Sequence, residues 1–104
     1  MTRRKLKPAH PGEILREEFM APLGLSVNKM AIDLRAPVTR IADIVNEKRG
    51  LTAETALRFA RYFNNSPVFW MNLQTRNELE VAQDELAAKV ERDVQPLETA
   101  ASRR

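Results

Sequence analysis

Two short amphipathic segments, separated by only two or three residues, constrain the fold of this chain more than any other feature. The first, residues 26–34, begins with Ser26, a residue type that caps helix N-termini well. The second, residues 37–46, begins with Pro37, which disfavours helical geometry at the residue before it and can itself open a helix. Apolar residues recur three or four positions apart, as one buried helix face requires, at Met30, Ala31, Leu34, Ile41, Ile44 and Val45.

Two helices with so short a connection must cross at a steep angle. The second helix then packs its apolar stripe on the first and projects its polar face outward. This is the geometry of a helix-turn-helix motif, in which an α-helix fits the major groove of DNA and presents side chains to base edges. The pair of segments therefore predicts a nucleic-acid-binding module.

The rest of the chain is also predicted to be helical, because no segment alternates apolar and polar residues with the period of two that strands require. A first helix begins at Pro11 and is broken at residues 21–25. A fourth helix is capped by Thr52 and ends at residues 64–65, and a fifth opens at residues 66–67. We therefore expect an all-α fold of five helices. The residues expected to face the core in the last two helices are Ala56, Leu57, Ala60, Phe63, Val68, Trp70 and Leu73, with Phe69 and Met71 as further candidates.

Three segments are expected along the chain. Residues 1–10 carry four Lys and Arg without any acidic residue and are expected to be a flexible basic arm. Residues 11–94 form the helix-turn-helix domain with an extended C-terminal helix, and residues 95–104 form a disordered tail.

The extended C-terminal helix carries a second apolar stripe, too long for the remaining core. It is expected to pack on a second subunit or a protein partner, the alternative being a helix that folds back over its own domain. The stripe consists of Leu79, Ala82, Leu86 and Val90.

The composition argues against an enzyme. The chain has 104 residues, no cysteine and a single histidine, His10. Zero cysteines exclude disulfides, Cys-ligated zinc and thiol catalysis, and one histidine leaves few routes to a metal site or an acid–base pair. We expect His10 to be a surface residue that precedes a helix, and we expect no metal and no cofactor. Because the chain lacks both a long apolar run and an apolar signal core, we expect a cytoplasmic protein without a membrane span.

Positive charge is concentrated in two places. It gathers in the basic arm and in residues 26–50, which carry five Lys and Arg against three Asp and Glu. Such a distribution suits a polyanion, most plausibly nucleic acid. A chance asymmetry of a solvated surface explains a net charge of +3 equally well.

Four segments of the chain carry a family resemblance. They are PGEIL at 11–15, PLGLSVNKMAIDLRAP at 22–37, RIADIVNEKRGLTAETALRFARYF at 40–63 and SPVFWMNLQTRNELEVA at 66–82. Through them, residues 11–86 closely resemble the HigA-type antitoxin family, small bacterial helix-turn-helix proteins of the phage Cro/repressor superfamily (XRE type). The resemblance implies an all-α fold of about five helices and a homodimer that binds double-stranded operator DNA, usually upstream of its own genes. It also implies neutralisation of a small basic toxin of the HigB/RelE type that cleaves messenger RNA on the ribosome.

The resemblance assigns base contacts to the exposed start of the helix at 37–46, beginning beside Pro37. It implies that Arg40 contacts guanine, that Thr39 reaches a base edge or a phosphate, and that Val38 meets a thymine methyl group. Asp43 is expected either to accept a hydrogen bond from cytosine or to orient Arg40. The residues expected to contact phosphates, and so to set the register, are Ser26, Asn28, Lys29, Arg35, Lys48 and Arg49.

Arg35 departs from the superfamily pattern, which often has glycine at this turn position for its positive φ. Two outcomes are open. Either the left-handed geometry is kept at a cost of roughly 1 kcal/mol, or the turn is rearranged and the helix at 37–46 is tilted.

Three functions follow from the sequence. The first is a sequence-specific repressor that is also the antitoxin of a toxin–antitoxin module and regulates its own operon. The second is a stand-alone helix-turn-helix regulator without a toxin. The third is a protein-interaction module that has lost DNA binding. A neighbouring gene for a small basic protein favours the first, and failure to bind upstream DNA at low salt favours the third.

Overall fold

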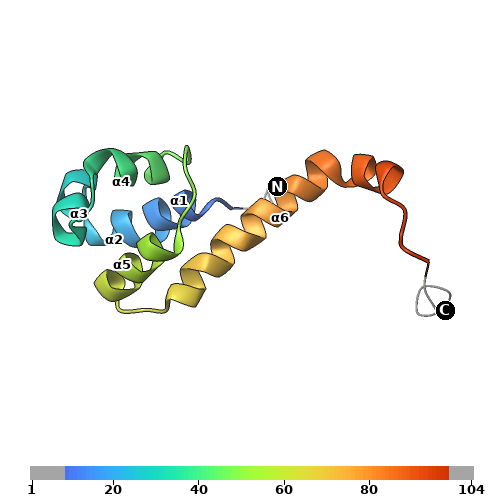
Figure 1. Ribbon diagram of the computed structural model, residues 1–104. Helices are drawn as coiled ribbons and strands as arrows, with labels where there is room; N and C mark the ends of the chain where they lie inside the picture. The colour runs from blue at the N-terminus through green and yellow to red at the C-terminus, as the bar shows by residue number, and fades with distance from the viewer. Residues whose placement is uncertain (1–8, 99–104) are drawn as a thin grey trace.

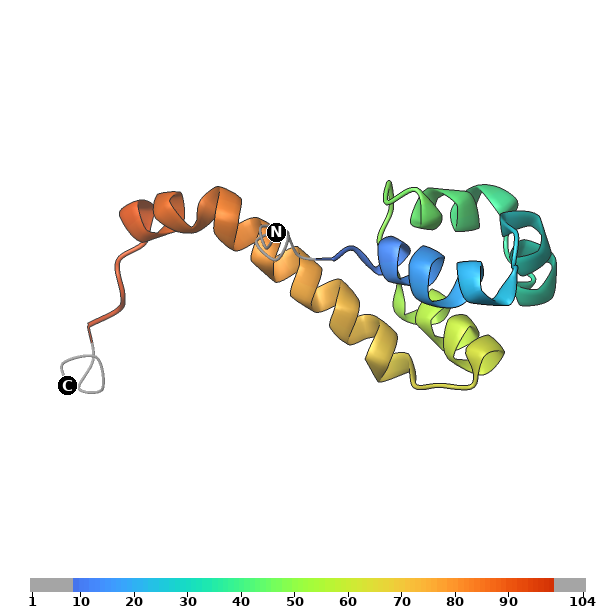
Figure 2. The same ribbon diagram turned by 180° about the vertical axis from the view of Figure 1, so that it is seen from behind.

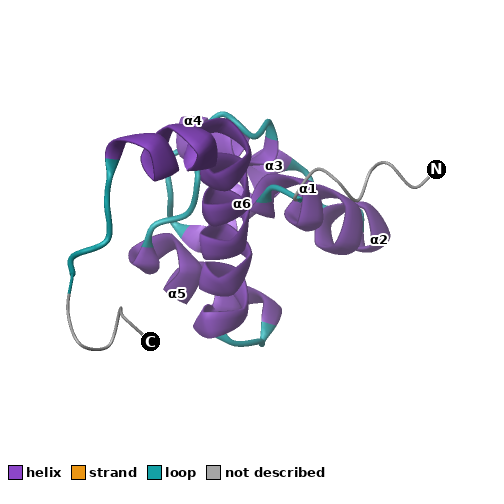
Figure 3. Ribbon diagram, turned by 90° about the vertical axis from the view of Figure 1, so that its right-hand side faces the viewer, coloured by secondary structure: helices purple, strands orange, loops and turns teal. Residues whose placement is uncertain are grey.

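The computed structural model describes residues 9–98, and within this range every regular element is a helix (Figures 1 and 3). The first three elements follow one another directly and form one continuous helix with a π-helical middle. Counted in this way, the described residues contain the predicted five helices, and the expectation of an all-α fold is confirmed. In chain order the elements are α1 (Pro11–Ile14), the π-helix η2 (Leu15–Met20), α2 (Ala21–Leu23), α3 (Val27–Leu34), α4 (Val38–Val45), α5 (Ala53–Phe63) and α6 (Pro67–Asp93).

The first helix runs further than predicted. It continues through Pro22 and ends only at Gly24, whose left-handed φ of 64° is typical of a helix C-terminus. The N–H of Ala21 bonds to the carbonyl of Arg16, five residues earlier, which is the π-helical pattern. In a regular α-helix the ring of Pro22 would clash with the carbonyl four residues before it. The wider turn relieves this clash, so the break expected at Ala21 was wrong.

The turn between α3 and α4 keeps the left-handed geometry. Ser26 caps α3 by accepting a hydrogen bond from the Lys29 N–H at 3.0 Å. Arg35, which ends α3, adopts φ 57° and ψ 45°, so the rearranged turn is not found. Pro37 is extended (φ −61°, ψ 140°) and precedes α4 as its N-cap rather than standing inside the helix. The two helices of the motif are therefore joined as predicted, with α4 beginning at Val38.

Aromatic rings from three helices form the centre of the core. Trp70 of α6 and Phe59 of α5 are fully buried, with ring centroids 5.1 Å apart in an edge-on arrangement. Phe19 of η2 lies 4.9 Å from Trp70. The indole N–H of Trp70 donates to Asn65 Oδ1 at 2.9 Å, so the buried ring has a polar partner. The apolar residues of the helix-turn-helix motif that join this core are Met30, Ala31, Leu34, Ile41, Ile44 and Val45.

Two residues predicted to face the core face solvent instead, and a third lies at its edge. Leu57 is 59% exposed and Val68 is 63% exposed. Phe69 is 39% exposed, with its ring centroid 5.1 Å from that of Trp70. Successive residues on a helix point about 100° apart, so a helix that buries Ala56 and Phe59 directs Leu57 away from the core. Val68 lies two residues before the buried Trp70 and so points to the opposite side of α6. The predictions for Leu57 and Val68 were wrong, and Phe59 was missed.

The C-terminal half of α6 projects away from the rest of the domain (Figures 1 and 2). Of the predicted stripe, Leu79, Leu86 and Val90 are exposed and Ala82 is half-buried, so the alternative in which this helix folds back was wrong. Residues 95–98 form an exposed segment without helix or strand, while the arm residues 1–8 and the tail residues 99–104 lie outside the described residues. None of the helices in residues 9–98 combines the length and apolar character needed to cross a bilayer.

Candidate nucleic-acid interface

The start of α4 presents the first three predicted base-reading residues to solvent. Pro37, Val38 and Thr39 are exposed, and Val38 exposes 46% of its surface although it is apolar. Ile41 and Ile44, on the other side of α4, are fully buried. The helix is therefore fixed on one face and free on the other, which is the disposition that major-groove recognition requires.

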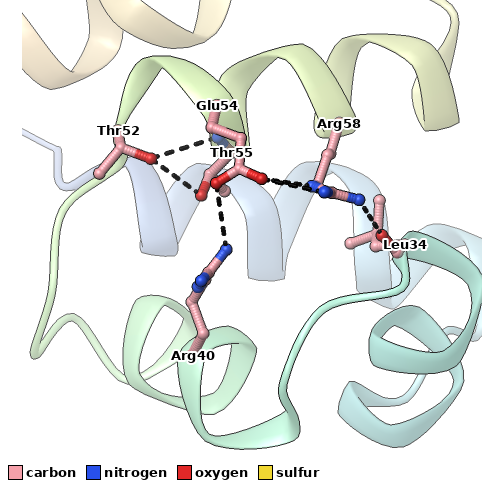
Figure 4. Close-up of polar contacts among 6 residues, drawn as sticks. All are labelled: Leu34, Arg40, Thr52, Glu54, Thr55 and Arg58. Atoms are coloured by element: carbon pink, nitrogen blue, oxygen red, sulfur yellow. Dashed lines mark hydrogen bonds and ion pairs between the residues drawn. The ribbon is translucent and has the colours of Figure 1, made fainter.

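Arg40 does not extend freely into solvent. Its guanidinium turns toward the start of α5, where Nη1 lies 3.7 Å from Glu54 Oε1 (Figure 4). The same carboxylate accepts hydrogen bonds from Arg58, at 2.9 Å to Nη2 and 3.2 Å to Nε. The pKa of Glu54 is lowered, first by the hydrogen bond with Arg58 and then by the charges of Arg58 and Arg40. The predicted base reader is thus held by a residue outside the motif.

Asp43 faces Arg49 rather than Arg40. Its Oδ2 lies 3.6 Å from Arg49 Nη2 in the loop after α4. The expected pairing of Asp43 with Arg40 was therefore wrong, because Glu54 takes that position. The main-chain carbonyl of Asp43 also accepts the Lys48 N–H at 2.8 Å, which closes the C-terminal turn of α4. Base contact by Asp43 stays a prediction.

The predicted phosphate-contacting residues lie around both ends of the motif. Asn28 and Lys29 are exposed in the first turn of α3, beside the capping hydroxyl of Ser26. Lys29 Nζ lies 3.2 Å from Asp33 Oδ2, and Asp33 also accepts a hydrogen bond from the Tyr62 hydroxyl. That hydrogen bond raises the pKa of Tyr62 to about 12 and lowers the pKa of Asp33. The other exposed cations of this set are Arg35, Lys48 and Arg49.

Two arginines from outside the motif hold the C-terminal ends of its helices. Arg58 of α5 donates to the carbonyl of Leu34, the last residue of α3, at 2.8 Å. Arg16 of η2 donates to the carbonyl of Val45, the last residue of α4, at 2.6 Å and pairs with Glu47 at 3.1 Å. Cations are favoured there because the last carbonyls of a helix lack partners and carry partial negative charge. Sequence reasoning missed both contacts, which join residues 24 and 29 positions apart.

His10 is a helix cap. It directly precedes α1, as expected, and its Nδ1 accepts the Gly12 N–H at 2.9 Å, a capping role that was not predicted. Burial lowers the pKa of His10, with opposing contributions from the neighbouring carboxylates. Among the residues that the structure describes, no group of three or more His, Cys, Asp or Glu side chains is arranged to hold a metal ion.

Comparisons with known proteins give a consistent result. No protein-family model matches the chain. Virulence-associated protein I of Dichelobacter nodosus is 49% identical over 73% of this chain and 70% of its own length. Antitoxin HigA-1 of Vibrio cholerae is 31% identical over 71% of this chain and 70% of its own length. A solved structure of Pseudomonas aeruginosa antitoxin HigA with the higBA promoter has a TM-score of 0.85 and 40% identity, covering 88% of this chain and all of that one.

The short α3–α4 pair, its left-handed turn and the exposed start of α4 define a helix-turn-helix protein of the Cro/repressor type. The similar proteins identify the family within this class. The chain belongs to the HigA antitoxin family.

Proposed function

We propose that this protein represses transcription by binding operator DNA through α4, and that it is the antitoxin of a toxin–antitoxin module whose operon it regulates. The observation that carries the proposal is the 40% identity and TM-score of 0.85 to all of a HigA chain solved with the higBA promoter. The free face of α4 supports it, because a helix buried on one side and open on the other can enter a groove without unfolding its domain.

In the proposed complex the first half of α4 enters the major groove. Val38, Thr39 and Arg40 read base edges, while Lys29 in the first turn of α3 and Lys48 in the loop after α4 contact phosphates and set the register. Two copies read half-sites about one helical turn apart, roughly 34–36 Å. Occupancy of the operator excludes other proteins from the promoter. No step of this function requires catalysis, a metal or a cofactor, and it belongs in the cytoplasm, where bacterial DNA lies.

The proposed antitoxin role requires a second partner, a small basic toxin of the RelE type. The surfaces available for a homodimer or for this toxin include the stripe on α6, since Leu79, Leu86 and Val90 are exposed and lie on a helix that leaves the domain. A contiguous row of exposed apolar side chains marks an interaction surface more often than apolar residues scattered singly over a surface do.

DNA binding is tested with the fragment upstream of the protein's own gene, labelled for fluorescence anisotropy and titrated at several salt concentrations. If a dimer contacts on the order of six phosphates, log K falls with log salt at a slope near −5. Arg40→Ala relaxes the preference at one base pair, whereas Lys48→Ala weakens binding to all sequences alike and reduces the salt slope. An affinity that does not depend on salt, or that is equal for unrelated DNA of the same length, contradicts the proposal.

The antitoxin role is tested by purifying the tagged protein from its native host and measuring the masses of the proteins that co-purify with it. A small basic protein in near-equal amount supports the module. A clean preparation that still binds upstream DNA, obtained while the neighbouring gene is expressed, indicates the stand-alone regulator instead. A preparation that binds neither the toxin nor the DNA leaves the protein-interaction module.

A further inference from the structure

A chain of polar contacts joins the turn of the motif to α4 by way of α5 (Figure 4). The carbonyl of Leu34, next to the turn, accepts a hydrogen bond from Arg58 Nη1 at 2.8 Å. Arg58 then donates twice to Glu54 Oε2, at 2.9 and 3.2 Å. The other oxygen of that carboxylate, Oε1, faces Arg40 Nη1 at 3.7 Å. Each carboxylate oxygen of Glu54 thus serves a different arginine.

The carboxylate of Glu54 is anchored, although its side chain is 59% exposed. Glu54 and Arg58 lie four residues apart on α5 and so occupy the same helix face. Charge-assisted hydrogen bonds from a guanidinium fix both the position and the orientation of a carboxylate. Arg58 is itself fixed at its other end by the main chain of α3. Glu54 therefore presents a negative charge at a defined place beside α4.

Arg40 is restrained by this charge without losing its hydrogen-bond donors. At 3.7 Å the contact with Glu54 is an ion pair, too long for a hydrogen bond, so the N–H groups stay available to a base. The Arg40 side chain is 30% exposed, so part of the guanidinium is accessible to a ligand. A long side chain that is ordered before binding loses less conformational entropy when it meets its target.

We infer that Glu54 is a positioning residue for DNA recognition: it aims the Arg40 guanidinium, and through Arg40 it sets the preference of the protein at one base pair. The inference rests on the proposed DNA binding. It has a second consequence, because a carboxylate near the DNA repels phosphates. Removing its charge therefore raises the affinity for DNA of any sequence while it lowers the discrimination at the Arg40 base pair. A merely structural contact would not confine the loss of discrimination to the one base pair that Arg40 reads.

The test uses the full-length protein and the site that footprinting defines upstream of its own gene, together with all single-base-pair variants of that site. Arg40→Ala first identifies the base pair that Arg40 reads, where a good pairing discriminates by about 5- to 150-fold. Glu54→Gln, which keeps the shape and removes the charge, is expected to reduce discrimination at that same base pair by about two- to fivefold. Discrimination elsewhere stays unchanged, and the affinity for unrelated DNA rises.

Glu80→Gln is the matched control, because it removes the carboxylate from a comparable pair, Arg76–Glu80 at 3.3 Å on α6. Glu80→Gln is expected to leave the discrimination between the site and each of its single-base-pair variants unchanged. In the Arg40→Ala background, Glu54→Gln must have no further effect on the ratio, as a double-mutant cycle for one shared interaction requires. Thermal unfolding of each variant checks that the domain is folded.

Three results obtained with folded variants overturn the inference while leaving the proposed function intact. They are an unchanged discrimination ratio in Glu54→Gln, an equal loss of discrimination at every position, or an effect of Glu54→Gln on the discrimination ratio at the Arg40 base pair that persists in the Arg40→Ala background. If the unmodified protein shows no preference for its upstream DNA, the proposed function itself fails. Poor folding of Glu54→Gln overturns the inference as well, because it would make the contact structural.

Discussion

At the scale of single residues, the turn of the motif contains a conformation that its side chain does not favour. Arg35 adopts a left-handed φ of 57°, in the region that favours glycine. The surrounding hydrogen bonds hold it there. The Ala36 N–H bonds to the Ala31 carbonyl at 3.1 Å, and the Leu34 carbonyl is held by Arg58. These bonds close the end of α3 only when Arg35 is left-handed, so they offset the local strain.

Arg35→Gly is expected to stabilise the protein and, because it removes a predicted phosphate contact, to weaken its binding to DNA. Glycine removes about 1–2 kcal/mol of left-handed strain from the folded state. Its greater conformational freedom also stabilises the unfolded chain by about 0.5–1 kcal/mol. A net gain of about 0.5–1 kcal/mol in the free energy of unfolding follows, measured by urea denaturation. Asn64→Gly, at φ 58°, is the control and should gain less, because asparagine tolerates this region. A loss of stability in Arg35→Gly would mean that its side chain contributes more than its backbone costs.

His10 makes the stability of the domain depend on pH. Burial lowers the pKa of His10 below 6.5, so the folded state prefers the neutral ring, whose Nδ1 accepts the Gly12 N–H. Below pH 6.5 the unfolded chain takes up the proton first, so the free energy of unfolding falls as the pH drops through the folded-state pKa. His10→Asn caps the helix without titrating. Urea denaturation at several pH values should therefore show that the free energy of unfolding falls less toward acid pH in His10→Asn than in the unmodified protein. An equal fall in both proteins would contradict this role of His10.

At the scale of elements, the position of α4 depends on a close crossing with α1. A Cβ added at Gly12 would lie 1.9 Å from the carbonyl oxygen of Ile44. No side chain fits at that distance, so glycine is required for the two backbones to approach. The same crossing is secured by Arg16, which donates to the carbonyl of Val45. Helix α1 therefore acts as the support against which the DNA-binding helix is set.

Gly12→Ala is expected to destabilise the protein by about 3 kcal/mol and to lower its affinity for DNA, since α4 must move to admit the methyl group. Gly24→Ala is the matched control. Gly24 has a φ of 64° and no atom within 4 Å of an added Cβ, so it incurs only left-handed strain of about 1–2 kcal/mol. Urea denaturation and anisotropy measure both effects. If the folded fraction of Gly12→Ala bound DNA normally, the support by α1 would not determine the position of α4.

The elements were predicted well because their signals are local. Ser26, Thr52 and Ser66 each cap the helix that follows, as their positions before apolar runs indicated. The exposure of Leu57 was mispredicted, because α5 has apolar residues on more than one face and only tertiary packing selects the buried one. The candidate site was predicted less completely. The (i, i+4) spacing of Glu54 and Arg58 is visible in the sequence, but their contacts to Leu34 and Arg40 depend on how helices cross.

At the scale of the whole molecule, α6 gives the protein an elongated shape, 55 × 32 × 22 Å (Figure 2). Its first half carries the buried Trp70 and Gln74, and Gln74 accepts the Leu51 N–H at 2.6 Å. Its second half contributes nothing to the core and leaves Leu86 and Val90 half exposed. A helix segment that projects in this way is only marginally stable by itself, because most helical stability in proteins comes from packing of an apolar face. A second copy of the chain would supply that packing.

Leu86→Lys is expected to convert the proposed dimer to a monomer, because it places a charge in the centre of the α6 stripe. Leu86 is 48% exposed in the single chain, so the domain itself should keep its stability to within about 0.5 kcal/mol. Ala88→Lys adds the same charge about 200° around the helix and is the matched control. Light scattering after size exclusion measures the mass, and anisotropy measures the loss of affinity for a two-half-site operator. A Leu86→Lys protein that stays dimeric would place the dimer contact elsewhere and leave the stripe to the toxin.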